Sequence, residues 1–154
     1  MDQISKHISY KEATQSPTAI QRGIKNDPNP IELNSMMEVA ELVFEPLREW
    51  YSKPIKINSF FRCEALNRAV GGAKTSQHRF GKAIDIDAGK DNLKLALWII
   101  ENVDFDQVII EGVDLLKNIA WIHLSYNRGH NRKQVLIMKK GKYYDFYSNK
   151  DMVI

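Results

Sequence analysis

The sequence predicts a small single domain of the α+β class, with a central antiparallel sheet flanked by helices. Three observations support this fold class. Helical periodicity comes first in the chain, strand-like alternation dominates later, and the later strand candidates suit antiparallel connections. With 154 residues, of which 44% are hydrophobic and 27% charged, the chain also has the length and composition of one globular domain.

The first part of the chain divides into a leader and a long helix. Residues 1–29 are polar and carry turn signals, so we expect a leader segment that packs on or precedes a domain formed by residues 30–154. Residues 31–51 form an amphipathic pattern, in which Pro46 predicts a kink near residues 42–46 or a break into two helices. The periodic apolar positions are Met36, Val39, Ala40, Val43, Phe44, Leu47 and Trp50.

The remaining elements are shorter. Residues 56–61 predict a strand, and residues 63–72 predict a helix capped by Gly71 or Gly72. KAIDID, residues 82–87, alternates as a strand does, and Asp91 is the expected cap of a helix over residues 92–102. The later strand candidates are FDQVIIEG (105–112), AWIHLSY (120–126) and a hairpin over QVLIMKKGKYYDFY (134–147) that turns at KKGK.

Composition and charge narrow the classes of function. Cys63 is the one cysteine, so no intramolecular disulfide forms. A net charge of +3 is too small to indicate a nucleic-acid groove by itself. The amino terminus lacks a signal-peptide pattern, and no apolar run is long enough for a bilayer. We therefore expect cytoplasmic synthesis without a signal peptide, no membrane insertion, no nucleic-acid partner, and a monomer.

Two stretches contain histidine and aspartate residues that could act as metal ligands. In SQHRFGKAIDID (76–87), His78 and Asp85 stand seven positions apart across Gly81, a spacing that indicates a turn running into a strand. In AWIHLSYNRGHNRK (120–133), alternation places His123 on the polar side of a strand with Trp121. Two histidines and one carboxylate are sufficient for a catalytic zinc site whose fourth position is left to water.

These residues also resemble a known family. Ser76, His78, Gly81, Ala83 and Asp85 match the SxHxxGxAxD signature of zinc peptidases that include D-Ala-D-Ala carboxypeptidases, D-Ala-D-Ala dipeptidases and the L-alanyl-D-glutamate endopeptidases of phage lysins. WIHLS is similar to the strand of the third ligand, and INSFFRCEALNRAVGGAKTSQH resembles the segment before the signature. The resemblance covers about residues 30–137 and implies the Hedgehog/DD-peptidase fold.

The resemblance also implies roles for single residues. His78, Asp85 and His123 would bind one Zn²⁺. Arg62 matches the arginine that faces substrate, where it would bind a carboxylate or the oxyanion, so we assign it to catalysis and to substrate binding. We assign Ser76 and Trp121 to substrate binding. The implied activity is that of a hydrolase, a metallopeptidase that cuts peptidoglycan stem peptides as a DD-carboxypeptidase or an L-Ala-D-Glu endopeptidase.

The sequence leaves the identity of the general base open between two carboxylates. Many relatives place a carboxylate three residues before the last histidine, where this chain has Ala120. Glu111, at the end of the preceding strand candidate, is the better candidate for a catalytic base, and Asp114 is the runner-up.

Two further departures concern apolar residues. Phe60 and Phe61, which precede Cys63, stand where smaller or polar residues are common in relatives, so we expect them to bulk up the approach to the pocket. Leu115 and Leu116, in the loop between two strand candidates, could form a lid or a partner contact, although we expect ordinary packing.

One rival function stays open, and a second is disfavoured by the small net charge. A zinc-binding but inactive domain that binds cell-wall peptides or a protein partner would fit the missing carboxylate at position 120. A nucleic-acid patch over NRGHNRK (127–133) would require binding that falls steeply with salt. The peptidase hypothesis places the action at the cell wall, after phage-type release as an endolysin or as a virion component.

Overall fold

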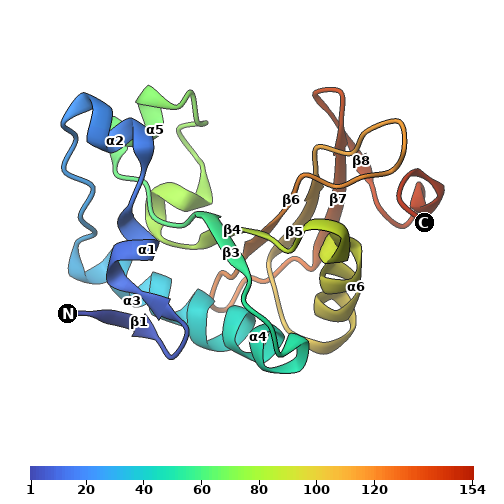
Figure 1. The fold of residues 1–154 in the computed structure, drawn as a ribbon, viewed down its shortest axis with the longest axis horizontal. Helices are drawn as coiled ribbons and strands as arrows, with labels where there is room; N and C mark the ends of the chain where they lie inside the picture. Colours follow the sequence, from blue (N-terminus) through green and yellow to red (C-terminus); the bar gives the residue numbers. More distant parts are fainter.

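A six-stranded sheet forms the centre of the computed structural model, which describes residues 1–154 (Figure 1). The strands lie in the order β3-β4-β6-β5-β7-β8. Their bounds are β3 Lys56–Ser59, β4 Ala83–Asp87, β5 Gln107–Glu111, β6 Trp121–Ser125, β7 Gln134–Lys139 and β8 Lys142–Asp145. The predicted α+β class and the central sheet are confirmed.

One strand pair departs from the expected antiparallel sheet. β5 and β6 pair antiparallel as expected, but β7 pairs with the other edge of β5 and runs parallel to it. β6 ends beside Gln107, and the connection over residues 126–133 crosses that end of β5, so β7 starts beside Gln107 and runs in the direction of β5. The β7–β8 hairpin turns as predicted, with positive φ angles of 51° at Lys140 and 75° at Gly141.

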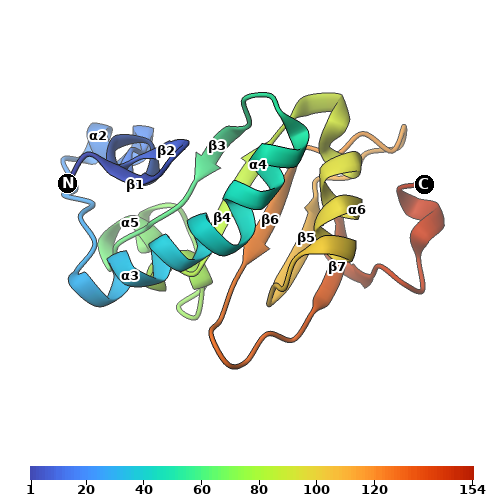
Figure 2. The same ribbon diagram turned by 90° about the horizontal axis from the view of Figure 1, so that it is seen from below.

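Helices cover one face of the sheet (Figure 2). They are α3 (Pro30–Val39), a π-helical turn η1 (Ala40–Phe44), α4 (Glu45–Tyr51) and α6 (Asn92–Asn102). The π-helical turn ends immediately before α4, where Pro46 occupies the first turn and lacks a backbone N–H. The predicted irregularity in the long helix is therefore confirmed as a π-helical turn between two α-helices.

The buried face of the sheet supplies much of the core. Alternate strand residues point toward the helices and are fully buried: Ile84, Ile86, Val108, Ile110, Ile122, Leu124 and Ile137. From the helices, Met36, Val39, Val43, Phe44 and Leu47 pack into the same cluster, as the periodic pattern predicts. Because side chains alternate along a strand, the residues between them occupy the opposite face, which is open to a pocket.

The amino-terminal segment contains more structure than its sequence suggested. It holds β1 (Gln3–Ser5), β2 (Ile8–Ser9), α1 (Tyr10–Thr14) and α2 (Pro17–Arg22), and Ile4, Ile8 and Ala13 belong to the core cluster. Elements of two to six residues are too short to produce a clear period in a sequence. The buried Asn26 amide donates to the carbonyls of Thr14 and Phe61 and accepts from the Cys63 N–H, which fixes the segment around Arg62.

Short elements complete the fold: α5 (Glu64–Ala69), and the 3-10 turns η2 (Gln77–Phe80), η3 (Gly89–Asp91) and η4 (Lys150–Met152). Gly71 follows α5 with φ 74°, as the predicted glycine cap requires. Asp91 occupies the N-cap position of α6 as predicted, but its carboxylate makes no capping hydrogen bond and accepts one from Tyr51 Oη at 2.7 Å. Just before the helix, Asn92 Oδ1 accepts from the Ala88 N–H at 2.7 Å.

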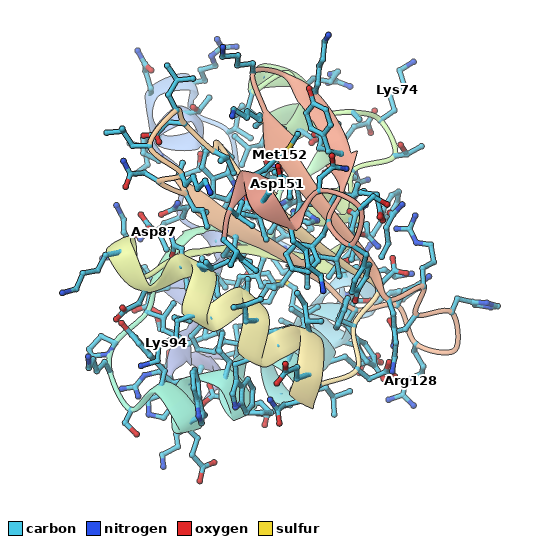
Figure 3. All side chains as sticks on the ribbon, turned by 90° about the vertical axis from the view of Figure 1, so that its right-hand side faces the viewer. Lys74, Asp87, Lys94, Arg128, Asp151 and Met152 are labelled. Atoms are coloured by element: carbon cyan, nitrogen blue, oxygen red, sulfur yellow. The ribbon has the colours of Figure 1, made fainter.

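The two termini lie toward opposite ends of the long axis (Figure 1). None of the helices combines the length and apolar character needed to cross a membrane. Viewed from the carboxyl-terminal side, the loops of Lys74 and Arg128 lie on the opposite side from Lys94 of α6 (Figure 3).

Candidate metal centre

Strand register brings the two late ligand candidates together. Asp85 of β4 stands directly opposite His123 of β6, and Oδ1 of Asp85 lies 3.1 Å from Nδ1 of His123. His78 comes from the η2 turn, with its Nε2 atom 3.2 Å from Asp85 Oδ2. One donor atom from each of the three residues lies within 4.8 Å of the others. The structure thus brings together the three residues that the sequence proposed as ligands.

A close contact with α3 positions the turn that carries His78. Gly81 follows η2, and its φ of 72° lies in the left-handed region that favours glycine. A Cβ atom at Gly81 would lie 2.5 Å from the Glu32 carbonyl oxygen and 2.8 Å from Met36 Cγ. Glycine is therefore required both for the turn and for the packing of η2 on α3.

The orientation of the His78 ring follows from its other nitrogen. Nδ1 lies 2.7 Å from the Phe60 carbonyl oxygen, which can only accept a hydrogen bond, so Nδ1 carries the proton. In a neutral imidazole this leaves the Nε2 lone pair facing Asp85. A backbone carbonyl in this position is a typical second partner of a metal-binding histidine.

The donor set fits a divalent metal ion. Zinc bonds of about 2.0–2.2 Å place tetrahedral donor atoms about 3.3–3.6 Å apart. The Asp85 oxygens lie at a similar distance from the two histidine nitrogens, 3.1 Å from Nδ1 of His123 and 3.2 Å from Nε2 of His78. Burial raises the pKa of Asp85, but His78 and His123 outweigh this effect and hold the pKa well below its usual value. Asp85 is thus an ionised carboxylate between two imidazoles, and the three residues could hold one cation.

The cluster lies in an open pocket of about 960 Å³. Side chains of η2, β4, β5, β6 and the loop after β6 form most of its walls. The lining residues are Arg62, Ala73, Thr75, Ser76, Gln77, His78, Asp85, Asp106, Gln107, Ile109, Glu111, Trp121, His123, Asn127, His130, Arg132, Leu136 and Tyr143. All residues that the sequence assigned to catalysis, substrate binding or the metal are among them.

Arg62 lines the same pocket and has hydrogen-bond donors without a protein partner. Its Nη2 atom donates to Ser76 Oγ at 3.1 Å, and its buried Nε atom has no protein partner. Burial lowers the pKa of Arg62, while the nearby negative charge of Asp85 raises it. A guanidinium keeps its charge in such a site, so Arg62 could donate to an anionic group in the pocket.

The two candidate bases occupy different environments. Glu111 is 8% exposed, lies opposite Trp121 at the end of β5, and lines the pocket. Burial is the largest effect on the pKa of Glu111 and raises it above its ordinary value, while the charge of His123 lowers this pKa and that of Asp85 raises it. Asp114 does not line the pocket, and its carboxylate accepts from the Leu116 N–H, the Asn118 N–H and Asn118 Nδ2. Geometry favours Glu111.

Two expectations about apolar residues were wrong. Phe60 and Phe61 do not bulk up the pocket, because both are at most 2% exposed and belong to the core cluster. Leu115 and Leu116 are not packed, because they are 77% and 82% exposed on a turn held by Asp114. In both cases the sequence shows hydrophobic character but not the direction of the side chain.

Sequence reasoning missed most of the pocket wall around Asp106. This residue is 1% exposed and accepts hydrogen bonds from Gln77 and Arg132, which lie far from it in the sequence. An aspartate before a strand has no signal that separates this role from an ordinary turn. Of the two arginines in the loop after β6, Arg132 lines the pocket, whereas Arg128 pairs with Glu38 and lies outside it.

Comparison with known proteins agrees with this geometry. The family model described as Peptidase M15 matches residues 6–125, which begins earlier than the expected residue 30. The zinc D-Ala-D-Ala carboxypeptidase of Streptomyces albus G is 35% identical over 60 residues, which cover 39% of this chain and 24% of that protein. The match therefore spans about a quarter of the length of that relative. Because the family match covers most of the sequence, the chain belongs to the peptidase M15 family.

Proposed function

We propose that this protein is a zinc-dependent peptidase that hydrolyses peptide bonds in peptidoglycan stem peptides. One observation carries the proposal. The donor atoms of His78, Asp85 and His123 lie within 4.8 Å of one another in a pocket that also contains the carboxylate of Glu111 and the guanidinium of Arg62. Membership of the M15 family and the name of the Streptomyces albus relative support zinc and this class of substrate.

The residues of the pocket suit hydrolysis by an activated water. A zinc ion bound at the three ligands would lower the pKa of a bound water toward about 7 and polarise the substrate carbonyl. Glu111 takes a proton from the attacking water and delivers it to the leaving amine. The buried position raises the Glu111 pKa, which makes this carboxylate a better proton acceptor than an exposed one.

Arg62 binds negative charge on the substrate. Its free donors bind the oxyanion that develops on the substrate carbonyl, or a carboxylate of the substrate. The bond to Ser76 Oγ holds the guanidinium in the pocket, so Ser76 acts by positioning Arg62. Trp121, beside Glu111, contributes an apolar wall for the peptide. Water attacks directly, without a covalent enzyme intermediate.

The substrate proposal covers two specificities. A DD-carboxypeptidase removes a terminal residue with a free carboxylate, and an L-Ala-D-Glu endopeptidase cuts within the stem peptide. Arg62 and Arg132 line the open pocket, so it suits a polar peptide with free carboxylates in either case. The proposed place of action is the cell wall.

The test combines metal binding with product analysis. We expect the purified protein to bind one zinc ion by elemental analysis and to release peptides from purified murein that mass spectrometry identifies. His123→Ala removes one of three ligands, so zinc affinity should fall by at least about 100-fold, with loss of hydrolysis. Glu111→Gln should keep zinc affinity within a few-fold and lower kcat by about 10²–10⁴-fold.

Asp114→Asn is the matched control, because it neutralises an exposed carboxylate near Glu111 in sequence but outside the pocket. It should keep both zinc binding and hydrolysis. Zinc binding without release of any peptide from murein would favour the inactive zinc-binding domain. Hydrolysis by Glu111→Gln at the wild-type rate would exclude this residue as the base.

A further inference from the structure

A second guanidinium is built into the pocket at some distance from the ligand cluster. Arg132 binds the carboxylate of Asp106 through two atoms, with Nε at 3.0 Å from Oδ1 and Nη2 at 2.9 Å from Oδ2. The backbone N–H of Arg132 also donates to Asp106 Oδ1 at 2.9 Å. The Asp106 side chain is 2% exposed, whereas that of Arg132 is 55% exposed. A buried carboxylate thus holds an accessible cation by both its side chain and its backbone.

The surrounding loop is fixed as well. Asn131 Oδ1 accepts from the Asn127 N–H at 2.8 Å, and Lys82 Nζ donates to Asn127 Oδ1 at 3.0 Å. Gln77, the neighbour of the ligand His78, donates to Asp106 Oδ2 at 2.7 Å. Asp106 therefore connects the turn that carries His78 with the loop that carries Arg132.

Arg132 keeps donors that no protein atom uses. Asp106 occupies the edge of the guanidinium formed by Nε and Nη2, while Nη1 has no partner in the protein. Both Arg132 and Asp106 line the same pocket as the ligand cluster. An arginine held along one edge presents its other edge in a fixed plane, which suits the two oxygens of a second carboxylate.

The strand register gives an approximate distance between the Arg132 side of the pocket and the ligand cluster. Ile109 pairs with His123, and Asp106 lies three residues before Ile109 in the sequence. At about 3.3 Å per strand residue, this places the Arg132 side of the pocket roughly 10 Å from the ligand cluster. An extended peptide covers the same distance in about three residues.

We propose that Arg132, held by Asp106, is a second carboxylate-binding subsite that selects peptides with an acidic group two to three residues from the cleaved bond. The identity of the substrate rests on the proposed peptidase function. Arg132 lies beyond residue 125, where the family match ends, whereas Asp106 and Gln77, which hold it in place, lie within the matched residues. Arg62 and Arg132 then bind two different anionic groups of one substrate.

The test uses two synthetic murein stem pentapeptides that differ only in the carboxylate of the second residue, which lies two to three residues from the terminal peptide bond and is free in one peptide and amidated in the other. A charged hydrogen bond to arginine corresponds to a preference of at least about 10-fold for the free carboxylate in kcat/KM. Calorimetric binding to the zinc-loaded Glu111→Gln protein should show the same preference in Kd. In Arg132→Gln, both preferences should fall below about 3-fold.

Two further variants separate recognition from folding. Arg128→Gln removes the same charge from the same loop, but Arg128 pairs with Glu38 outside the pocket, so this variant should keep the full preference. Arg132→Lys keeps a cation beside the buried Asp106 if Arg132→Gln fails to fold. A lysine lacks the planar fork, so its preference should also fall several-fold.

The outcomes distinguish the two proposals. A wild-type protein that cleaves neither peptide refutes the proposed function, and the binding preference then decides whether the subsite exists. Equal binding of the two peptides by wild type, or an unchanged preference in the Arg132 variants, overturns the subsite and leaves Arg132 as an anchor of its loop.

Discussion

Replacing Gly81 by alanine tests the contact that positions His78. The new Cβ would lie 2.5 Å from the Glu32 carbonyl oxygen, which is backbone and cannot move aside as a flexible side chain does. Two costs add. A non-glycine residue at φ 72° costs about 1–2 kcal/mol, and overpacking against α3 costs about 1–3 kcal/mol. The expected loss in the free energy of unfolding is therefore about 2–5 kcal/mol.

Gly23→Ala is the matched control. Gly23 also follows a helical element with a left-handed φ, of 64°, but nothing lies within 4 Å of the position that a Cβ atom would take there. This variant should lose only the backbone cost of about 1–2 kcal/mol. The difference between the two variants measures the contact between η2 and α3.

Urea unfolding at neutral pH gives both free energies, and calorimetric zinc titration gives the effect on the site. Gly81→Ala should weaken zinc binding because η2 must move away from α3 and carries His78 with it. Equal losses of stability in Gly81→Ala and Gly23→Ala would refute the reasoning. Unchanged zinc affinity in Gly81→Ala would show that the contact does not position His78.

Two other predictions concern buried polar residues. Asn26→Ala removes three hydrogen bonds around Arg62, so the free energy of unfolding should fall by about 2–4 kcal/mol in urea unfolding, with the exposed Asn34→Ala as a control near zero. For Asp106, burial raises the pKa, but the hydrogen bonds from Arg132 and Gln77 outweigh it and lower the pKa. Its stabilisation is therefore complete above the unfolded pKa of about 3.9 and is lost as the pH falls through the lower folded pKa. Urea unfolding between about pH 7 and pH 3 should show a smaller loss of stability in Asp106→Asn than in wild type, and parallel curves would contradict this.

Local patterns predicted a large part of this protein. Strand alternation in β4 and β6 separated the buried Ile84 and Ile122 from the pocket residues Asp85 and His123. The period of the long helix and the position of Pro46 predicted an irregular turn in the chain. These predictions succeed because alternation and helical period depend on backbone geometry within a few residues.

Predictions that required the direction of a side chain relative to distant elements were less successful. Phe60 and Phe61 enter the core, whereas Leu115 and Leu116 stay in solvent, although all four are strongly apolar. The parallel pairing of β7 with β5 depends on the path of the loop over residues 126–133. No residue of β7 encodes that path by itself.

Local sequence patterns were sufficient to place the candidate ligands His78, Asp85 and His123 on a turn and two strands, and to identify the glycine that the turn requires. The choice between Glu111 and Asp114 as the carboxylate that shares the pocket required the packed fold, because the two residues are three positions apart and β5 ends between them. It also joined Asp106 to Arg132 and Gln77 across 26 and 29 residues. Contacts of that range depend on how the strands and loops pack, which short-range patterns do not specify.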